Sequence, residues 1–431
     1  MILIYWKWKV GKGIAGLCDY LNISYEIKDD TDAIEYTQYD FIIPSPGIPS
    51  HHIVYKSWKV KSELDFVYSF LPKDFRIIAV TGTDGKSTTS WILYELLRNE
   101  YGSDKVYLSG NFDIPFSETV REILQKWQKR GYIVLEVSSF MAYSLKSFEC
   151  DYAIFTNFKP DHLNWHKDLQ DYLNSKMHLL IRARKKAVLC EQILTFAENE
   201  WLELSPPKNS RYYTFDPESE NDSIKEKRKD RTNGENIIIS GRRKYLLSET
   251  NFSWNHNALN ILSATIVTNE MGICSKHTKE YLKNITWLPH RLEKIGEKHG
   301  VIFVEDSKST SAQSLEAALS SYGQSDQKNL LLIVWWSDKW DSFEWLSLKL
   351  KNRVKAMVCI WATKDTFLLI AKREGIPSLA TDSLTQWVEW LYNQSNTGDV
   401  LMLSPGCASF WLFRDYLDRA NQFREAIKKL P

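Results

Sequence analysis

The sequence Thr81-Gly82-Thr83-Asp84-Gly85-Lys86-Ser87-Thr88 directly follows the apolar run Arg76–Val80 and precedes a stretch with helical periodicity. In a glycine-rich turn between a strand and a helix, backbone N–H groups converge on phosphate oxygens at the helix N-terminus. Lys86 would reach the β- and γ-phosphates of a nucleotide, and the Ser87 hydroxyl would bind Mg²⁺. Val80 replaces the first glycine of the general pattern G-x-x-x-x-G-K-[ST]. A turn that only joins a strand to a helix leaves the Gly-Lys-Ser-Thr run unexplained, so we predict a nucleotide-binding loop.

Outward from this loop, short apolar runs alternate with helical stretches, which is typical of parallel α/β sheets. The runs are Ile2–Tyr5, Phe41–Ile43, Arg76–Val80, Tyr132–Val137, Tyr152–Phe155, Ala187–Cys190, Leu330–Val334, Ala356–Trp361 and Asp399–Leu403. Breaks near Leu71–Phe75 and Thr286–His290 predict three α/β domains, residues 1–73, 74–288 and 289–431. We expect a Rossmann-like first domain, a central P-loop domain with a mostly parallel sheet, and a Rossmann-like third domain. The polar stretch Asp216–Asn236 reads as a solvated loop.

Composition excludes several classes of protein. The chain has 431 residues, with 55 Lys+Arg against 54 Asp+Glu, so no net field attracts nucleic acid or an anionic membrane. Six cysteines without a CxxC pair argue against a zinc ribbon or a disulfide framework. No apolar run approaches the roughly 18 residues of a spanning helix, and the N-terminus does not resemble a signal peptide. A cytoplasmic protein is expected.

Polar residues at the carboxyl ends of two further strands predict a metal site beside the loop. Glu136 ends one apolar run, and Asp161-His162 follows another, with Asn157 between. Mg²⁺ takes hard oxygen ligands, and one or two carboxylates suffice. A single glutamate at a strand end is more often a surface or capping residue. Several such ends near one phosphate loop favour the metal.

These motifs resemble the Mur ligase family, ATP-dependent amide-forming enzymes that build the peptide of peptidoglycan. The family's phosphate loop stands at Gly82–Thr88, its Glu-x-Ser-Ser-Phe at Glu136–Phe140, and its Asn-x-x-x-Asp-His at Asn157–His162. Other family motifs stand at Gly110-Asn111, His256–Asn260, His290-Arg291 and Asp306–Lys308. The resemblance extends from residue 1 to about residue 425, in the family's order.

The resemblance implies ATP, two Mg²⁺ ions and a lysine carbamylated by CO₂, here Lys176. The implied catalytic residues are Lys86, His162 and Lys176. The implied metal ligands are Ser87, Glu136, His162 and Lys176. The implied ATP-binding residues are Gly82, Thr83, Asp84, Gly85, Lys86, Ser87, Thr88, Asn257, Asn260, Arg291 and Asp306.

The resemblance also implies two small-molecule substrates, UDP-N-acetylmuramoyl-L-alanine and D-glutamate. A monomer without nucleic-acid or membrane partners is expected. The first domain would bind UDP, and the implied muropeptide contacts are Ser45, Pro46, Gly47, Asn111, Ser138 and His162. The third domain resembles the D-glutamate-adding branch. Its implied pocket consists of Lys308, Thr310, Lys339, Ser409, Phe410 and Tyr416. Two lysines and hydroxyl donors suit a dicarboxylate, although Tyr416 would serve equally well as helix core.

Two other functions remain open at this point. A catalytically silent nucleotide- or muropeptide-binding protein could use the same scaffold. A folate-type polyglutamate ligase is a second alternative, which the motif Ser404–Phe410 disfavours.

The tryptophans form an anomaly. The chain has 18 Gly and 17 Trp, whereas average usage predicts about 30 Gly. Tryptophan stands where the family has glycine at Trp6, Trp8, Trp254, Trp287, Trp335, Trp336, Trp340 and Trp361, and Trp58 joins this set. An indole does not suit a turn that needs positive φ. We hypothesise that UGA codons meaning glycine in the source were translated as tryptophan. Trp165, Trp387 and Trp390 match no family glycine and are expected to be genuine.

Overall fold

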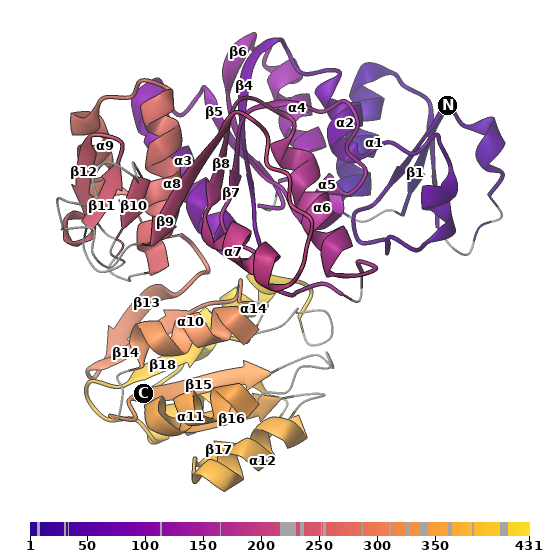
Figure 1. Cartoon of the computed structure of the whole chain (residues 1–431). Helices are drawn as coiled ribbons and strands as arrows, with labels where there is room; N and C mark the ends of the chain where they lie inside the picture. Colours follow the sequence, from indigo (N-terminus) through magenta and orange to yellow (C-terminus); the bar gives the residue numbers. More distant parts are fainter. Residues whose placement is uncertain are drawn as a thin grey trace. The chain divides into compact units, whose positions relative to one another are not determined.

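A computed structural model of the chain forms two compact units, Met1–Thr286 and Trp287–Pro431 (Figure 1). The structure describes residues 1–6, 9–29, 32, 34–112, 114–163, 165–215, 230–232, 237–250, 252, 256–286, 288–309, 312–323, 327–335, 344–360, 364–381, 383–405 and 413–431.

The first unit opens with a small parallel sheet in the strand order β2-β1-β3. Its elements are β1 (Ile2–Tyr5), α1 (Lys9–Leu21), β2 (Tyr25–Lys28) and β3 (Phe41–Pro44). All four residues of β1 are buried, because this strand lies between two neighbours and under helix α1. Beyond the carboxyl ends of β1 and β3, Ser45 N donates to the Tyr5 carbonyl at 3.0 Å. The first residue after β3 is thus fixed against the end of β1.

The same unit contains a nine-stranded sheet in the order β12-β11-β10-β9-β8-β7-β4-β6-β5. Its strands are β4 (Asp74–Thr81), β5 (Val106–Gly110), β6 (Arg130–Glu136), β7 (Cys150–Phe155), β8 (Ala183–Cys190), β9 (Ser210–Phe215), β10 (Asp230–Thr232), β11 (Ile237–Ser240) and β12 (Arg243–Leu246). Strands β4 to β10 pair in parallel, and β11 and β12 are antiparallel. Strand β10 corrects the expectation that Asp216–Asn236 is wholly a solvated loop.

The helices of this unit are α2 (Glu63–Tyr68), α3 (Lys86–Tyr101), α4 (Phe116–Gln125), α5 (Ser139–Ala142), α6 (Leu169–Leu180), α7 (Gln192–Asn199), α8 (His256–Glu270) and α9 (Ser275–Asn284). Strand β4, which leads into the phosphate loop, lies between β6 and β7. Register pairs Val80 with Glu136 and Thr81 with Phe155. The carboxyl ends of three strands therefore meet at the loop, where ligands bind in open α/β sheets.

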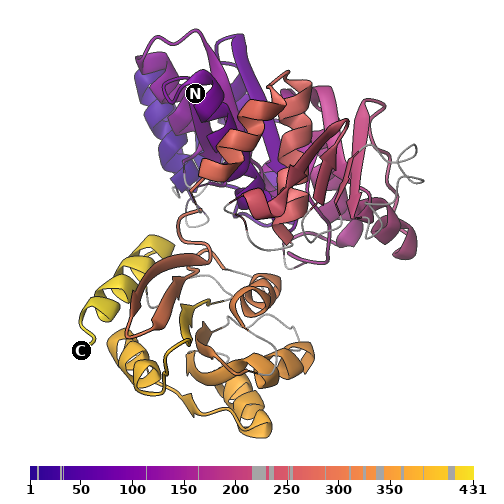
Figure 2. The same ribbon diagram turned by 90° about the vertical axis from the view of Figure 1, so that its left-hand side faces the viewer.

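The second unit has a six-stranded sheet in the order β13-β14-β18-β15-β16-β17. Its strands are β13 (Glu293–Lys298), β14 (Val301–Glu305), β15 (Leu330–Trp335), β16 (Val354–Ile360), β17 (Ser378–Leu379) and β18 (Val400–Leu403). Its helices are α10 (Ala312–Tyr322), α11 (Glu344–Arg353), α12 (Lys364–Glu374), α13 (Leu384–Asn393) and α14 (Tyr416–Lys428). Helices cover both faces of the sheet (Figure 2). Within the described part of this six-stranded sheet, only the β13–β14 pair is antiparallel.

The predicted α/β fold class with mostly parallel sheets is confirmed. The predicted strands correspond to strands of the structure, because continuous apolar runs are typical of strands buried on both faces. Among the described residues, no helix is both long and apolar enough to cross a membrane.

Helix α2 joins the first sheet to the central sheet through two buried carboxylates. The Ser62 hydroxyl caps the helix by accepting from Asp65 N at 3.0 Å. Glu63 Oε1 accepts from both the backbone N–H and the hydroxyl of Ser117, at 3.0 and 2.8 Å. Asp65 accepts from the consecutive N–H groups of residues 146–148. Both side chains are buried, so α2 is fixed against the start of α4 and against residues 146–148.

Burial raises the pKa of Glu63 from 4.5 to about 7. The unfolded chain therefore loses this proton first as the pH rises, and the free energy of unfolding falls between pH 4.5 and about 7. Glu63→Gln removes this component. The stability of the variant relative to the parent should rise by about 2–3 kcal/mol between pH 5 and pH 8, measured by urea unfolding. Glu122→Gln on α4, with a side chain 45% exposed, is the control. If the difference in free energy of unfolding between Glu63→Gln and the parent were the same at pH 5 and pH 8, the raised pKa of Glu63 would be contradicted.

Candidate active site

The phosphate loop has the glycines that its backbone requires. Gly85 caps helix α3 with φ 75°, and a β-carbon there would lie 2.5 Å from Asn260 Oδ1. At Gly82, with φ 154°, a β-carbon would lie 1.9 Å from Thr156 Oγ1. Both positions therefore exclude side chains. The loop amides and the N-terminus of α3 are left facing the carboxyl edge of the sheet, as phosphate binding needs.

Residues that follow strand β7 hold the loop in place. Asp84 N donates to Asn157 Oδ1 at 2.8 Å, and Asn157 Nδ2 donates to the Asp84 carbonyl at 3.0 Å. Thr156 Oγ1 donates to the same carbonyl at 2.6 Å. Lys86 Nζ donates to the carbonyls of Gly82 and Thr83 at 3.0 and 2.7 Å. Lys86 is half-buried, so its ammonium can exchange these carbonyls for phosphate oxygens.

Lys176, on helix α6, contacts the phosphate loop. Its side chain is buried, and Nζ donates to the Gly82 carbonyl at 2.8 Å. Nζ also lies 4.5 Å from the centre of the Tyr172 ring. Burial, followed by repulsion from Lys86, holds the pKa of Lys176 well below its ordinary value of 10.5. The structure thus brings Lys86 and Lys176 to one carbonyl and favours the neutral amine at Lys176.

Glu136, at the end of β6, has a buried carboxylate that can accept a further hydrogen bond or bind a cation. Oε1 accepts from Asn111 Nδ2 at 2.7 Å. Oε2 is buried and has no hydrogen-bond partner within the described part of the chain. A buried carboxyl oxygen without a partner is costly unless a cation or donor satisfies it. A carboxylate oxygen of this kind, like the hydroxyl of Ser87 that the loop motif predicts as a ligand, is the hard oxygen donor that Mg²⁺ takes.

Ser138 and His162 lie on two segments that are held together by contacts between aromatic rings. Ser138 caps α5 by accepting from Met141 N at 3.3 Å. His162 has φ 57°, an uncommon conformation for a residue other than glycine. Its ring lies 4.7 Å from that of Phe140 in an edge arrangement. The predicted muropeptide residues Asn111, Ser138 and His162 are therefore placed around the end of β6 and the start of α5.

His166, which the motifs did not indicate, connects these segments. Its Nδ1 lies 3.0 Å from Asp171 Oδ2, and its Nε2 lies 2.9 Å from Ser139 Oγ. Burial lowers the pKa of His166. A neutral ring with its proton on Nδ1 donates to the carboxylate and accepts from the serine hydroxyl. The His166 ring thereby ties α5 to α6, the helix that carries Lys176. In the sequence, the only feature that could have indicated His166 is its position four residues after His162.

On the nucleotide side, Asn257 and Asn260 lie on helix α8, which packs against α3. Both are buried. Asn260 Nδ2 donates to Asn257 Oδ1 at 3.3 Å, and Thr89 Oγ1 donates to Asn260 Oδ1 at 3.3 Å. Asn260 thus reaches the first turn of α3 beside Gly85, as expected for residues near a bound nucleotide.

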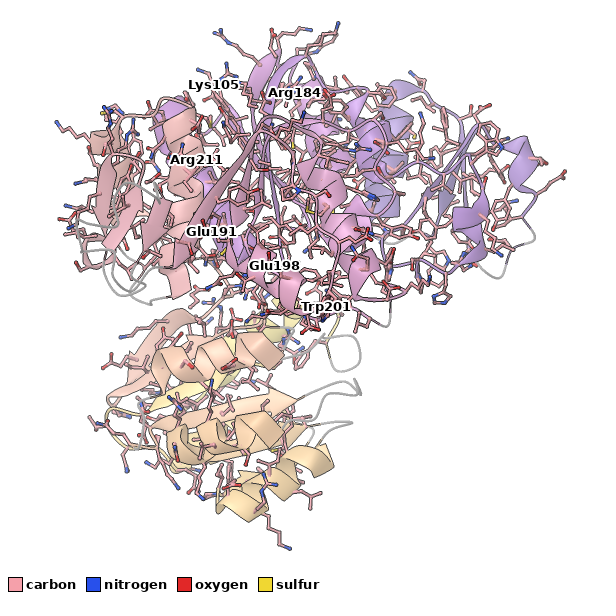
Figure 3. The ribbon with its side chains drawn as sticks, in the orientation of Figure 1. Lys105, Arg184, Glu191, Glu198, Trp201 and Arg211 are labelled. Carbon is pink, nitrogen blue, oxygen red and sulfur yellow. The ribbon has the colours of Figure 1, made fainter. Side chains whose placement is uncertain are left out.

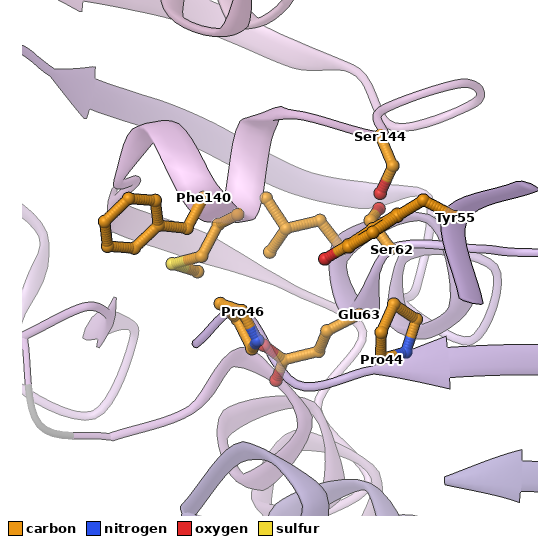
Figure 4. A pocket seen from close by; sticks show the side chains of 9 residues that line it. Pro44, Pro46, Tyr55, Ser62, Glu63, Phe140 and Ser144 are labelled. Carbon is orange, nitrogen blue, oxygen red and sulfur yellow. The ribbon is translucent and has the colours of Figure 1, made fainter. Parts of the chain in front are cut away.

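The predicted UDP loop Ser45-Pro46-Gly47 leads into a small pocket (Figure 4). Pro46, Tyr55, Glu63 and Phe140 are among the residues that line the pocket. The neighbouring Ser50 Oγ donates to the Trp165 carbonyl at 2.8 Å. This part of the first domain is therefore directly connected to the segments that carry Ser138 and His162.

In the second unit, the structure places Arg291, Asp306, Lys308 and Tyr416. Asp306 is buried and accepts from Leu292 N at 3.1 Å and from Ser404 Oγ at 2.8 Å. Burial raises its pKa to about 7, against the opposing charge of Arg291. Lys308 Nζ lies 5.1 Å from the centre of the Tyr416 ring. Thr310, Lys339, Ser409 and Phe410 lie outside the described residues.

Comparison with known proteins identifies the family. Residues 80–268 match the model of the Mur ligase middle domain. The chain is 30% identical over 437 residues to UDP-N-acetylmuramoylalanine--D-glutamate ligase of Aquifex aeolicus, covering 99% of this chain and 98% of that protein. The chain belongs to the Mur ligase family. A protein of the same name from Christiangramia forsetii is 27% identical, covering 98% of this chain and 93% of its own.

Solved structures of other Mur ligases share the fold. MurC of Thermotoga maritima aligns with a TM-score of 0.64 at 13% identity, covering 99% of each chain. MurF of Thermotoga maritima in complex with ADP aligns with a TM-score of 0.59 at 15% identity, covering 91% of this chain and 88% of that one. The family resemblance predicted from the motifs is confirmed, and with it ligase activity, ATP binding and a role in peptidoglycan precursor synthesis.

The Ser139–His166 hydrogen bond can be tested by a double-mutant cycle. His166→Phe keeps an aromatic ring but removes both hydrogen bonds, and Ser139→Ala removes the shared one. Each single variant should lower kcat/KM for ATP-dependent ligation about tenfold. Thermal unfolding of each variant checks that it is folded. The double variant should be clearly less impaired than the product of the two effects. Fully multiplicative losses would show that His166 does not act through Ser139.

Proposed function

We propose that this chain joins D-glutamate to the L-alanine carboxylate of UDP-N-acetylmuramoyl-L-alanine, with conversion of ATP to ADP and phosphate. The observation that carries this proposal is the convergence of Lys86, Lys176 and the partly unsatisfied Glu136 carboxylate on one phosphate loop. The near-complete alignment with ligases named for D-glutamate supports the choice of amino acid.

In the proposed complex, the loop amides and Lys86 bind the phosphates of ATP, and Asn257 and Asn260 contact the nucleotide at α8. Arg291 and Asp306 are also predicted to contact ATP. Glu136, Ser87, His162 and Lys176 would hold the metal ions. Mg²⁺, when bound, neutralises charge on the triphosphate.

Lys176 is proposed to carry a carbamate. A buried amine with a strongly lowered pKa is largely neutral, and its lone pair can attack CO₂. The N–C bond forms, one proton leaves the nitrogen, and the side chain becomes an anion. This change turns a donor toward the Gly82 carbonyl into an oxygen ligand for a cation. It also places a negative charge near the Lys86 ammonium, which bonds the same Gly82 carbonyl.

The chemistry proceeds in two steps in this proposal. An oxygen of the L-alanine carboxylate attacks the γ-phosphorus of ATP, and ADP leaves, giving an acyl phosphate while Lys86 stabilises the transferring phosphoryl group. The D-glutamate amine then attacks the acyl carbon, and phosphate leaves from the tetrahedral intermediate as the amide forms.

Substrate binding is divided among the predicted residues. Asn111, Ser138 and His162 orient the muropeptide, and the loop Ser45–Gly47 contacts its UDP. Lys308 and Lys339 supply charge for the two carboxylates of D-glutamate, with Thr310 and Ser409 as hydroxyl donors. Phe410 and Tyr416 would close the same pocket.

The test of this function is phosphate release from ATP with UDP-N-acetylmuramoyl-L-alanine and each of D-glutamate, L-glutamate and L-lysine. Release that depends on D-glutamate and yields a product heavier by one glutamyl residue is expected. Release with L-glutamate or L-lysine instead would overturn the choice of substrate. Binding of ATP and muropeptide without release would indicate a silent binding protein.

Replacement of Lys176 tests the carbamate. Lys176→Ala should lose activity about 100-fold or more, because it removes a proposed metal ligand. Acetate or another short carboxylate should restore part of the activity by occupying the vacated space. Lys86→Ala is the matched control and should stay inactive with acetate, since its role is that of a cation. Full activity of Lys176→Ala without additive would refute the carbamate.

A further inference from the structure

Two exposed tryptophans end helices in the backbone conformation that favours glycine. Trp127, just beyond α4, has φ 55°. Its N–H donates to the Leu124 carbonyl at 3.1 Å, and the next N–H, of Gln128, donates to the Ile123 carbonyl at 3.1 Å. This pair of hydrogen bonds defines the Schellman motif, whose left-handed residue is usually glycine.

Trp201, just beyond α7 (Figure 3), repeats this geometry. Its φ is 56°. Its N–H donates to the Glu198 carbonyl at 3.2 Å, and Leu202 N donates to the Ala197 carbonyl at 2.8 Å. Neither position was among the tryptophans that the family motifs had singled out.

The same chain uses glycine for this turn elsewhere. Gly272, beyond α8, has φ 83° and donates to the Asn269 carbonyl at 3.1 Å, while Ile273 N donates to the Thr268 carbonyl at 3.0 Å. Gly375, beyond α12, also has positive φ, 67°, and the following N–H donates to the Ala371 carbonyl. Beyond α1 the same turn has Asn22, with φ 55° and both hydrogen bonds, and asparagine is the usual alternative to glycine in this turn. Trp127 and Trp201 therefore occupy a position that other helix ends in the described part of the chain give to glycine or asparagine.

The indole side chains make little buried contact that would offset the cost of a backbone with positive φ. A bulky residue at positive φ is a genuine outlier. Trp127 is 77% exposed and Trp201 is 93% exposed, so neither side chain is packed in a core. Nine described residues other than glycine have positive φ, and three of them are tryptophan. Tryptophan supplies only 17 of 431 residues, so chance predicts fewer than one.

The third of these is Trp6, at the end of β1, with φ 74°. Its carbonyl accepts from Ser45 Oγ at 2.8 Å. A β-carbon on Gly11 would lie 2.4 Å from the same carbonyl, so the backbone is closely surrounded here. Trp6 is also one of the positions where the family has glycine. Trp8, Trp254, Trp287, Trp336, Trp340 and Trp361 lie outside the described residues.

We propose that residues 6, 127 and 201 are glycine in the protein as its own cells make it. The tryptophans arise where a UGA codon that the source decodes as glycine has been read as tryptophan. Backbone geometry at helix ends, independent of any family motif and of the proposed function, leads to the same hypothesis as the shortage of glycine. It also extends the set of misread positions to Trp127 and Trp201.

The gene and the native protein provide the direct test. The codons for Trp6, Trp127 and Trp201 should be UGA, whereas those for the buried Trp165 and Trp387 should be UGG. Peptide masses of the protein isolated from its source should show glycine at the three positions. UGG codons or tryptophan masses at these positions would overturn the proposal.

A stability measurement tests the backbone argument separately. At 127 and at 201, the glycine variant should have a higher Tm than the alanine variant, by roughly 2 °C per site, because only glycine accepts positive φ without strain. Trp390, inside helix α13, is the matched control, and there alanine should be the more stable. Alanine equal to or better than glycine at both 127 and 201 would contradict the geometry.

Discussion

The amide of Asn157, which bonds both backbone groups of Asp84, is the interaction on which the rest of the site depends. It attaches the phosphate loop after β4 to the segment after β7, and β6 ends beside them at Glu136. Three strand ends are thereby held at one edge of the sheet. The loop takes its position from this attachment, Lys176 bonds the loop at Gly82, and Glu136 is placed by the pairing of β6 with β4.

The buried ionisable groups of the site are expensive for folding. Glu136 has a carboxylate oxygen without a partner among the described residues, and Lys176 is a buried amine beside Lys86. Folding alone would favour neutral or paired groups at both positions. Their presence is explained if ligands complete the site, because phosphates and cations supply the charges that the protein lacks. Helix α2 and His166 contribute differently, since Glu63 Oε1, Asp65 and His166 bond to groups of neighbouring segments and fix those segments.

Sequence reasoning predicted that the phosphate loop and Glu136 stand at strand ends, and the structure has them there, because each belongs to a short motif next to an apolar run; the roles of these residues and of His162 stay predictions. It missed His166, whose role depends on Ser139 and Asp171 meeting in space, and no local pattern encodes such a meeting. Similarly, the αL turns at Trp127 and Trp201 became visible only from backbone geometry, since no motif marks those helix ends. The pocket for the amino acid remains a prediction at Thr310, Lys339, Ser409 and Phe410, which lie outside the described residues.

The central claim is that ATP activates the muropeptide carboxylate at the phosphate loop. Its most direct test is the fate of oxygen atoms in a substrate whose L-alanine carboxylate is labelled with ¹⁸O. An acyl phosphate formed by attack of that carboxylate on the γ-phosphorus transfers one labelled oxygen to inorganic phosphate, with ADP as the other product. The account predicts one ¹⁸O in each phosphate released during amide formation. Unlabelled phosphate, or AMP and pyrophosphate as products, would contradict it.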